Sequence, residues 1–162
     1  MNDTEIVKHY WAQFLASLPP GAERPVEYYE AFSFGSSKES TRSITPLVLE
    51  GIKTATGSLL WSYEAAGRRP PMVGDYSIVT DGEEPVGVIL DTEVRILPYD
   101  QVDAAFAWDG GEEDRTLDSW RQMYWDYIVQ ECARLGREPT LQVPLVCERF
   151  RLVYKEALKA EE

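Results

Sequence analysis

The chain has 162 residues, of which 44% are hydrophobic and 12% aromatic, and its 28 acidic and 16 basic residues give a formal net charge of −12. This length and apolar content suffice for one domain with a sizeable core and exclude a largely disordered chain. The negative charge repels polyanions at long range, which excludes indiscriminate coating of nucleic acid. Any nucleic-acid role therefore requires a local basic pocket.

The first expected element is a helix over about 4–18, which the Pro19-Pro20-Gly21 sequence stops. His9 is the single histidine of the chain and lies in this segment, where we expect it on the helix surface. One histidine disfavours a histidine-based triad, a zinc site built on several imidazoles and a two-histidine nuclease. We expect an accessory helix and connector over 1–31.

A second helix is predicted from the cap candidates of Ser40–Pro46, with the proline in its first turn and its end near Gly51. The β-branched residues that follow predict a strand over 54–61. Lys53 then lies at a junction between a helix and a strand.

The remaining elements are read from turn signals and periodicity. Gly136 closes a long helix that starts at Thr116, because apolar residues recur there at steps of three and four. The others are a brief helix over 63–69, a hairpin of strands 76–80 and 86–97, a short helix over 100–107, an acidic loop over 110–114, a strand over 144–154 and a charged tail over 155–162.

Helices interrupting four or five strands, some joined by hairpins, predict an α+β fold built on a small mixed, mostly antiparallel β-barrel with flanking helices. A doubly wound sheet is disfavoured because no G-x-G-x-x-G follows a strand. Cys132 and Cys147 form no C-x-x-C and are expected to be buried free thiols. Without a run of about 18 apolar residues or a signal-like start, we expect a cytoplasmic protein that makes no membrane contact.

Five stretches resemble, in order and spacing, the ASCH domain family, whose fold is similar to that of PUA RNA-binding domains. The resemblance runs from Phe32 to Tyr154, so it implies a domain over 32–154. It also implies RNA or a nucleoside as partner, with no DNA expected, and leaves the oligomeric state open. The stretches are FSFG, GIKTATGSLLWSYEAAG, VGDYSIVTDGEEPVGVILDTEV, DRTLDSWR and PLVCERFRLVY.

The family hallmark, G-x-K-x-x-T, is present here as Gly51, Lys53 and Thr56. In members that remove an acyl group from acetylated cytidine, the matching lysine is taken as base and the threonine as nucleophile. A glutamate before the long helix is assigned to the transition state, and it matches Glu112, with Glu113 as the fallback. Other members are described as metal-dependent ribonucleases, and the domain has been proposed as an RNA-binding module. The resemblance thus implies a hydrolase of either kind, or a non-catalytic RNA-binding or regulatory module, with no cofactor except a divalent metal in the ribonuclease case.

The lysine can accept a proton from Thr56 only if it is neutral, which burial favours and nearby carboxylates oppose. In a strand Lys53 and Thr56 would lie on opposite faces, so they converge only if the chain turns or bulges between them. The alternative is that Lys53 solvates a helix C-terminus and that Thr56 is an ordinary strand residue. The helix dipole likewise stabilises the acids of 112–114 near a helix N-terminus without any function. The other possibility is that these acids hold a divalent cation.

Ligand-binding candidates surround this motif. Trp61, at the end of the expected strand, and Trp108, beside the acidic loop, are candidates for stacking on bases, and Arg68 with its neighbour Arg69 for a phosphate contact. Gly51 and Ser58 belong to the motif stretch, and Tyr124 is either a hydrogen-bond donor or a core residue. Relatives commonly carry histidine in place of Tyr124, aspartate in place of Ser36 and a different loop sequence at Gly110, which favours an altered substrate or binding alone.

Overall fold

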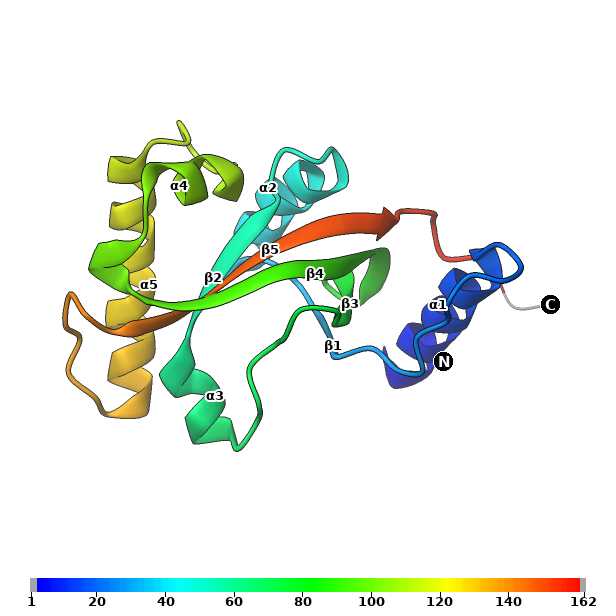
Figure 1. Cartoon of the computed structure of the whole chain (residues 1–162), viewed down its shortest axis with the longest axis horizontal. Coiled ribbons are helices and arrows are strands. Elements are labelled where there is room, and N and C mark those ends of the chain that lie inside the picture. Colours follow the sequence, from blue (N-terminus) through cyan, green and yellow to red (C-terminus); the bar gives the residue numbers. More distant parts are fainter. Residues whose placement is uncertain (1–2, 161–162) are drawn as a thin grey trace. The chain divides into compact units, whose positions relative to one another are not determined.

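The computed structural model describes residues 3–160 and has the predicted α+β organisation (Figure 1). One five-stranded sheet has the strand order β1-β3-β4-β5-β2. The β1–β3 pair is parallel, whereas the β3–β4 and β2–β5 pairs are antiparallel. The strands are β1 Glu30–Phe32, β2 Ala55–Leu59, β3 Tyr76–Asp81, β4 Glu84–Pro98 and β5 Pro144–Tyr154, and the helices are α1 Asp3–Ser17, α2 Lys38–Leu49, α3 Leu60–Ala66, the 3-10 helix η1 Tyr99–Gln101, α4 Ala104–Gly110 and α5 Leu117–Leu135.

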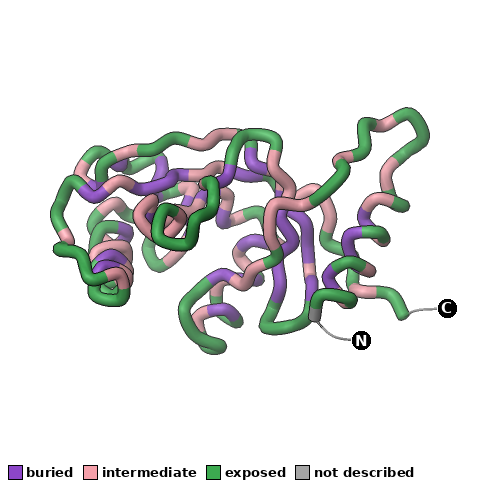
Figure 2. The backbone as a smooth tube through the Cα atoms, turned by 90° about the horizontal axis from the view of Figure 1, so that it is seen from below, coloured by how far each residue is buried: buried purple, intermediate pink, exposed green. Residues whose placement is uncertain are grey.

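The chain divides into two compact units. The first contains the described parts of 1–51, 74–90 and 151–162, and the second contains 52–73 and 91–150. The long strands β4 and β5 each contribute residues to both units. Buried positions fall along the strands and recur along the helices (Figure 2).

In the first unit, α1 supplies core residues. Its Tyr10 and Phe14 are almost fully buried and belong to one cluster with Ile78 of β3 and Val88 of β4. The chain after β5 is attached to the same helix, since the Tyr10 hydroxyl donates to the Glu156 carbonyl over 2.6 Å. His9 is half-buried on α1, where its Nε2 lies 3.0 Å from the Lys159 carbonyl oxygen.

The start of α2 differs from the prediction. A capping box between Ser37 and Ser40 begins the helix at Lys38, so Pro46 lies inside α2 and not in its first turn. The predicted end is confirmed, because α2 stops at Leu49 and Gly51 adopts a left-handed φ of 76°.

Two further predictions need correction. Strand β2 stops at Leu59, and α3 begins at the next residue, so Trp61 lies in a helix and not at the end of the strand. The predicted helix over 63–69 therefore starts earlier. Strand β1 was missed, because its three residues are too few to show an alternating pattern.

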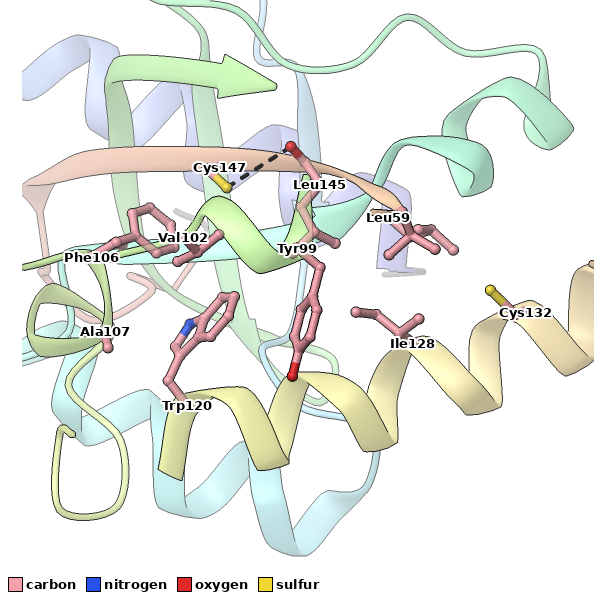
Figure 3. Close-up of a cluster of buried hydrophobic side chains, with 12 residues drawn as sticks. Leu59, Tyr99, Val102, Phe106, Ala107, Trp120, Ile128, Cys132, Leu145 and Cys147 are labelled. Atoms are coloured by element: carbon pink, nitrogen blue, oxygen red, sulfur yellow. Dashed lines mark hydrogen bonds between the residues drawn. The ribbon is translucent and has the colours of Figure 1, made fainter. Parts of the chain in front are cut away.

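The core of the second unit is built on α5 (Figure 3). Trp120, Ile128 and Cys132 project from this helix towards Tyr99 and Leu59. The predicted helix boundaries are confirmed, since Thr116 caps the start and Gly136 has a left-handed φ of 71°.

Both cysteines are buried free thiols, as predicted. Burial raises the pKa of the Cys132 thiol, and it raises that of Cys147 to about 12. The two thiols are therefore poor nucleophiles in the folded protein.

Candidate functional site

Lys53 is buried in the second unit, with only 1% of its surface exposed. Its Nζ donates to the carbonyl oxygens of Ala55 over 2.8 Å and of Gly110 over 3.2 Å. It also lies 3.0 Å from Glu112 Oε2 in an ion pair. These acceptors can take all three ammonium protons. A lysine that merely solvates a helix end would be exposed, so the structure disfavours that alternative.

Two opposing effects act on the pKa of Lys53. Burial lowers it, and the charge and hydrogen bond of Glu112 raise it, with burial the larger effect. The pKa of Lys53 therefore lies below its ordinary value. This increases the fraction of neutral amine near neutral pH, which a base requires.

The end of α4 is packed directly on the junction that carries Lys53. The Thr54 N–H donates to the Asp109 carbonyl over 2.7 Å. A Cβ at Gly111 would lie 2.8 Å from the Ile52 oxygen and 2.9 Å from the Lys53 Cα. Only glycine allows this close approach, at a left-handed φ of 72°. The glycine pair 110–111 thus brings the Gly110 carbonyl and the Glu112 carboxylate to the lysine.

A second pair forms at Thr56 in β2. The phenol of the half-buried Tyr124 accepts the N–H of Gly57, the residue after Thr56, over 2.9 Å, and the Thr56 side chain is near enough to lower the pKa of that phenol. Burial raises the pKa of Tyr124, and the Glu112 carboxylate raises it further, so the phenol keeps its proton. We call Lys53, Thr56, Glu112 and Tyr124 the Lys53 cluster.

The backbone at the junction departs from a regular strand, because β2 begins only at Ala55. Lys53 therefore precedes the strand, and the alternation of faces along a strand does not relate it to Thr56. Lys53 contacts Glu112, and the pKa of Tyr124 responds both to that carboxylate and to Thr56. Glu113, the fallback for the acidic position, is exposed.

The other predicted ligand residues make separate contacts. The Ser58 hydroxyl lies 2.8 Å from the Tyr63 hydroxyl. Trp61 carries the Arg137 guanidinium 3.6 Å from its ring centroid. Arg68 is exposed, 5.9 Å from the centroid of the Tyr63 ring.

Gly51 belongs to the first unit, where its N–H donates to the Val48 carbonyl over 3.1 Å at the end of α2. Ser36, which stands where relatives commonly carry aspartate, lines an open hollow of about 460 Å³ in the same unit. Lys38 and Arg42 also line this hollow, together with the acidic Asp81.

Sequence reasoning missed Arg115 and the two carbonyl groups that hold Lys53. The Arg115 guanidinium lies 3.8 Å from the centroid of the Trp108 ring, which is 55% exposed. A backbone acceptor leaves no trace in residue type, although the consecutive glycines 110 and 111 signalled a close approach.

Two acids of the 112–114 loop, Glu112 and Asp114, already have partners in the chain. Among residues 3–160, no group of three or more His, Cys, Asp or Glu side chains could hold a metal ion. Glu112 is engaged by Lys53, and the Asp114 carboxylate accepts from both the N–H and the hydroxyl of Thr116. Within the same described range, no helix is both long and apolar enough to cross a membrane.

Comparison with known families identifies the fold around this site. The sequence model of the ASCH domain matches residues 30–154. The chain belongs to the ASCH domain family. The ASCH assignment agrees with the predicted family and with the predicted α+β barrel of PUA-like type.

Two crystal structures resemble this ASCH protein over most of its length. The ASCH domain from Lactobacillus crispatus JV V101 is 30% identical, covers 93% of this chain and 95% of its own, and superposes with a TM-score of 0.86. A protein from Enterococcus faecalis V583 is also 30% identical, covers 94% and 90%, and has a TM-score of 0.82. No curated protein matches the chain.

Proposed function

We propose that this ASCH domain binds a nucleoside or an RNA segment at the Lys53 cluster and hydrolyses an acyl amide on the base. The observation that carries the proposal is the buried ion pair of Lys53 and Glu112. The kind of ligand is taken from the resemblance to ASCH domains that act on acetylated cytidine.

A buried ion pair is weak evidence for a purely stabilising role. Removing two charges from water costs several kcal/mol per ion, and apolar residues of similar volume often replace a buried pair without loss. Ionisable groups with a perturbed pKa and a specific charge partner are common at functional sites. The lowered pKa of Lys53 beside Glu112 matches that pattern.

The chemistry divides among the members of the cluster. The Thr56 hydroxyl attacks the acyl carbonyl carbon while its proton passes to the neutral amine of Lys53 or to the Glu112 carboxylate. The amine of the base leaves with a proton, and water then releases the acyl group as a carboxylic acid. The Tyr124 phenol accepts the N–H of Gly57, the residue after Thr56, and so helps to fix the strand that carries the attacking hydroxyl.

A binding-only module is the alternative, and one observation favours it. The Lys53 ammonium has three acceptors in place, which stabilise the charged form that cannot act as a base. The metal-dependent ribonuclease alternative has less support, because Glu112 is paired with Lys53 and the described residues include no group of three or more side chains that could hold a metal ion.

Calorimetric titration tests the binding that both alternatives share. Cytidine, N4-acetylcytidine and a short RNA are titrated into the wild-type protein, Glu112→Gln and Glu113→Gln. Glu113 is the matched control, because it is the adjacent glutamate and is exposed. We expect saturable binding that Glu112→Gln weakens by about tenfold or more, the factor for about 1.4 kcal/mol. Glu113→Gln should leave it unchanged, and a wild-type protein that binds none of the three would refute the proposal.

A further inference from the structure

The loop that carries Glu112 has an unusual backbone. Glu113 and Arg115 have φ angles of 54° and 64°, the only positive values among non-glycine residues in the described part of the chain. Such conformations cost about 1–3 kcal/mol each and persist only where the surroundings enforce them. Two of them within the three residues after Glu112 indicate that the surroundings fix this loop.

The contacts of Arg115 supply part of that constraint, beside the hydrogen bonds from Thr116 to the Asp114 carboxylate. Its backbone N–H donates to the Glu112 carbonyl over 3.0 Å, which closes a turn over 112–115. Its Nε donates to the Trp108 carbonyl over 2.8 Å, and its guanidinium is stacked 3.8 Å from the Trp108 ring centroid. A longer contact of 3.5 Å joins the guanidinium to the carbonyl of Ile52, the residue before Lys53.

These contacts tie together the segments that form the ion pair. The Trp108 carbonyl lies two residues before Gly110, whose carbonyl holds the Lys53 ammonium. The Ile52 carbonyl adjoins Lys53 in sequence, and the turn begins at Glu112. The geometry points to Arg115 as a positioning residue that holds the Glu112 carboxylate against the Lys53 ammonium.

Stacking alone does not explain this arrangement. Arg137 covers the Trp61 ring at 3.6 Å in the same unit, so the chain offers a second stacked arginine. The described contacts of Arg137 are with α3 and with the end of α5, where its N–H donates to the Cys132 carbonyl over 3.0 Å. Arg137 is therefore the matched control for loss of an arginine stacked on tryptophan.

NMR of the Lys53 ammonium group tests the positioning role of Arg115. The exchange of its protons with water is followed through the side-chain ¹⁵N signal in the wild-type protein, Arg115→Ala, Arg115→Lys and Arg137→Ala. A tightly held ammonium exchanges slowly. We expect Arg115→Ala to accelerate exchange by about tenfold or more, which corresponds to about 1.4 kcal/mol of lost protection. Arg137→Ala should stay near the wild-type rate, with Arg115→Lys in between.

Backbone ¹H–¹⁵N spectra show whether each variant is folded. If Arg115→Ala does not fold, Arg115→Lys decides the question, because it keeps the charge and loses the planar donors of the guanidinium. A folded Arg115 variant with a Lys53 exchange rate within about twofold of wild type would overturn the inference. So would equal acceleration in Arg137→Ala.

The importance of Arg115 for catalysis rests on the proposed function. The Lys53 exchange rate can be measured whether or not that function is correct. A protein that binds no cytidine while its Arg115 variants loosen Lys53 would refute the function and leave the positioning role intact. Binding and turnover that survive in Arg115→Ala with an unchanged Lys53 signal would do the reverse.

Discussion

At the scale of single residues, Lys53 combines a chemical role with a structural one. Its ammonium satisfies two buried carbonyl groups as well as Glu112. Replacing it leaves these acceptors without a donor, and each buried unsatisfied polar group costs about 1–3 kcal/mol. A loss of activity in a Lys53 variant could therefore come from lost catalysis or from lost stability. Glu112, whose side chain is 19% exposed, separates the two effects better.

We predict that Lys53→Ala lowers the free energy of unfolding by about 3–5 kcal/mol, the usual cost of breaking a buried ion pair. Urea denaturation measures the change, with Lys159→Ala as the control because Lys159 is exposed. A decrease below about 1 kcal/mol would show that the buried contacts of Lys53 are weaker than their geometry indicates.

At the scale of elements, the outer edge of β2 is covered by two tyrosines of α5. Strand β2 is last in the sheet order, so one of its edges has no neighbouring strand within residues 3–160. The Tyr124 hydroxyl accepts the Gly57 N–H over 2.9 Å, and the Tyr127 hydroxyl accepts the Leu59 N–H over 2.9 Å. These hydroxyls accept the hydrogen bonds that a further strand would otherwise accept from the edge of β2.

The two tyrosines form a matched pair that separates stability from function. Tyr124→Phe and Tyr127→Phe each leave one strand N–H without its acceptor, so both should lower the free energy of unfolding by about 1–3 kcal/mol. The pKa of Tyr124, unlike that of Tyr127, responds to Glu112 and Thr56, so only Tyr124→Phe should impair hydrolysis or binding of N4-acetylcytidine. Urea denaturation and calorimetry on both variants check this. Equal functional losses would show that Tyr124 acts only through the stability of β2.

The elements easiest to predict are those whose ends are marked by residues within the element's own sequence. Helix α5 was predicted well because Thr116 and Gly136 mark its ends within the sequence. Pro46 was misplaced because a serine capping box, a weaker signal than proline, starts α2. The family motif indicated Lys53 and Glu112, but their contact joins positions 59 residues apart, and periodicity cannot show such a pairing.

At the scale of the whole molecule, the family and the fold class are established, whereas the role of α1 exceeds what the sequence indicated. Its aromatic residues complete the core of the first unit, and the match to the Lactobacillus structure extends beyond residues 30–154. The division into an accessory segment over 1–31, a domain over 32–154 and a tail stays a prediction. The sequence alone did not show this role of α1, because the residues that pack on its apolar face lie outside the helix.

The proposed reaction of the Lys53 cluster is the hydrolysis of an acylated nucleoside. The most direct test is mass spectrometry of N4-acetylcytidine incubated with wild-type protein, Glu112→Gln and Glu113→Gln. We predict that wild type and Glu113→Gln release cytidine and acetate, and that Glu112→Gln is slower by about 10²-fold or more, as for loss of a group that transfers a proton. Saturable binding without product would leave a binding module, and turnover unchanged in Glu112→Gln would contradict the account.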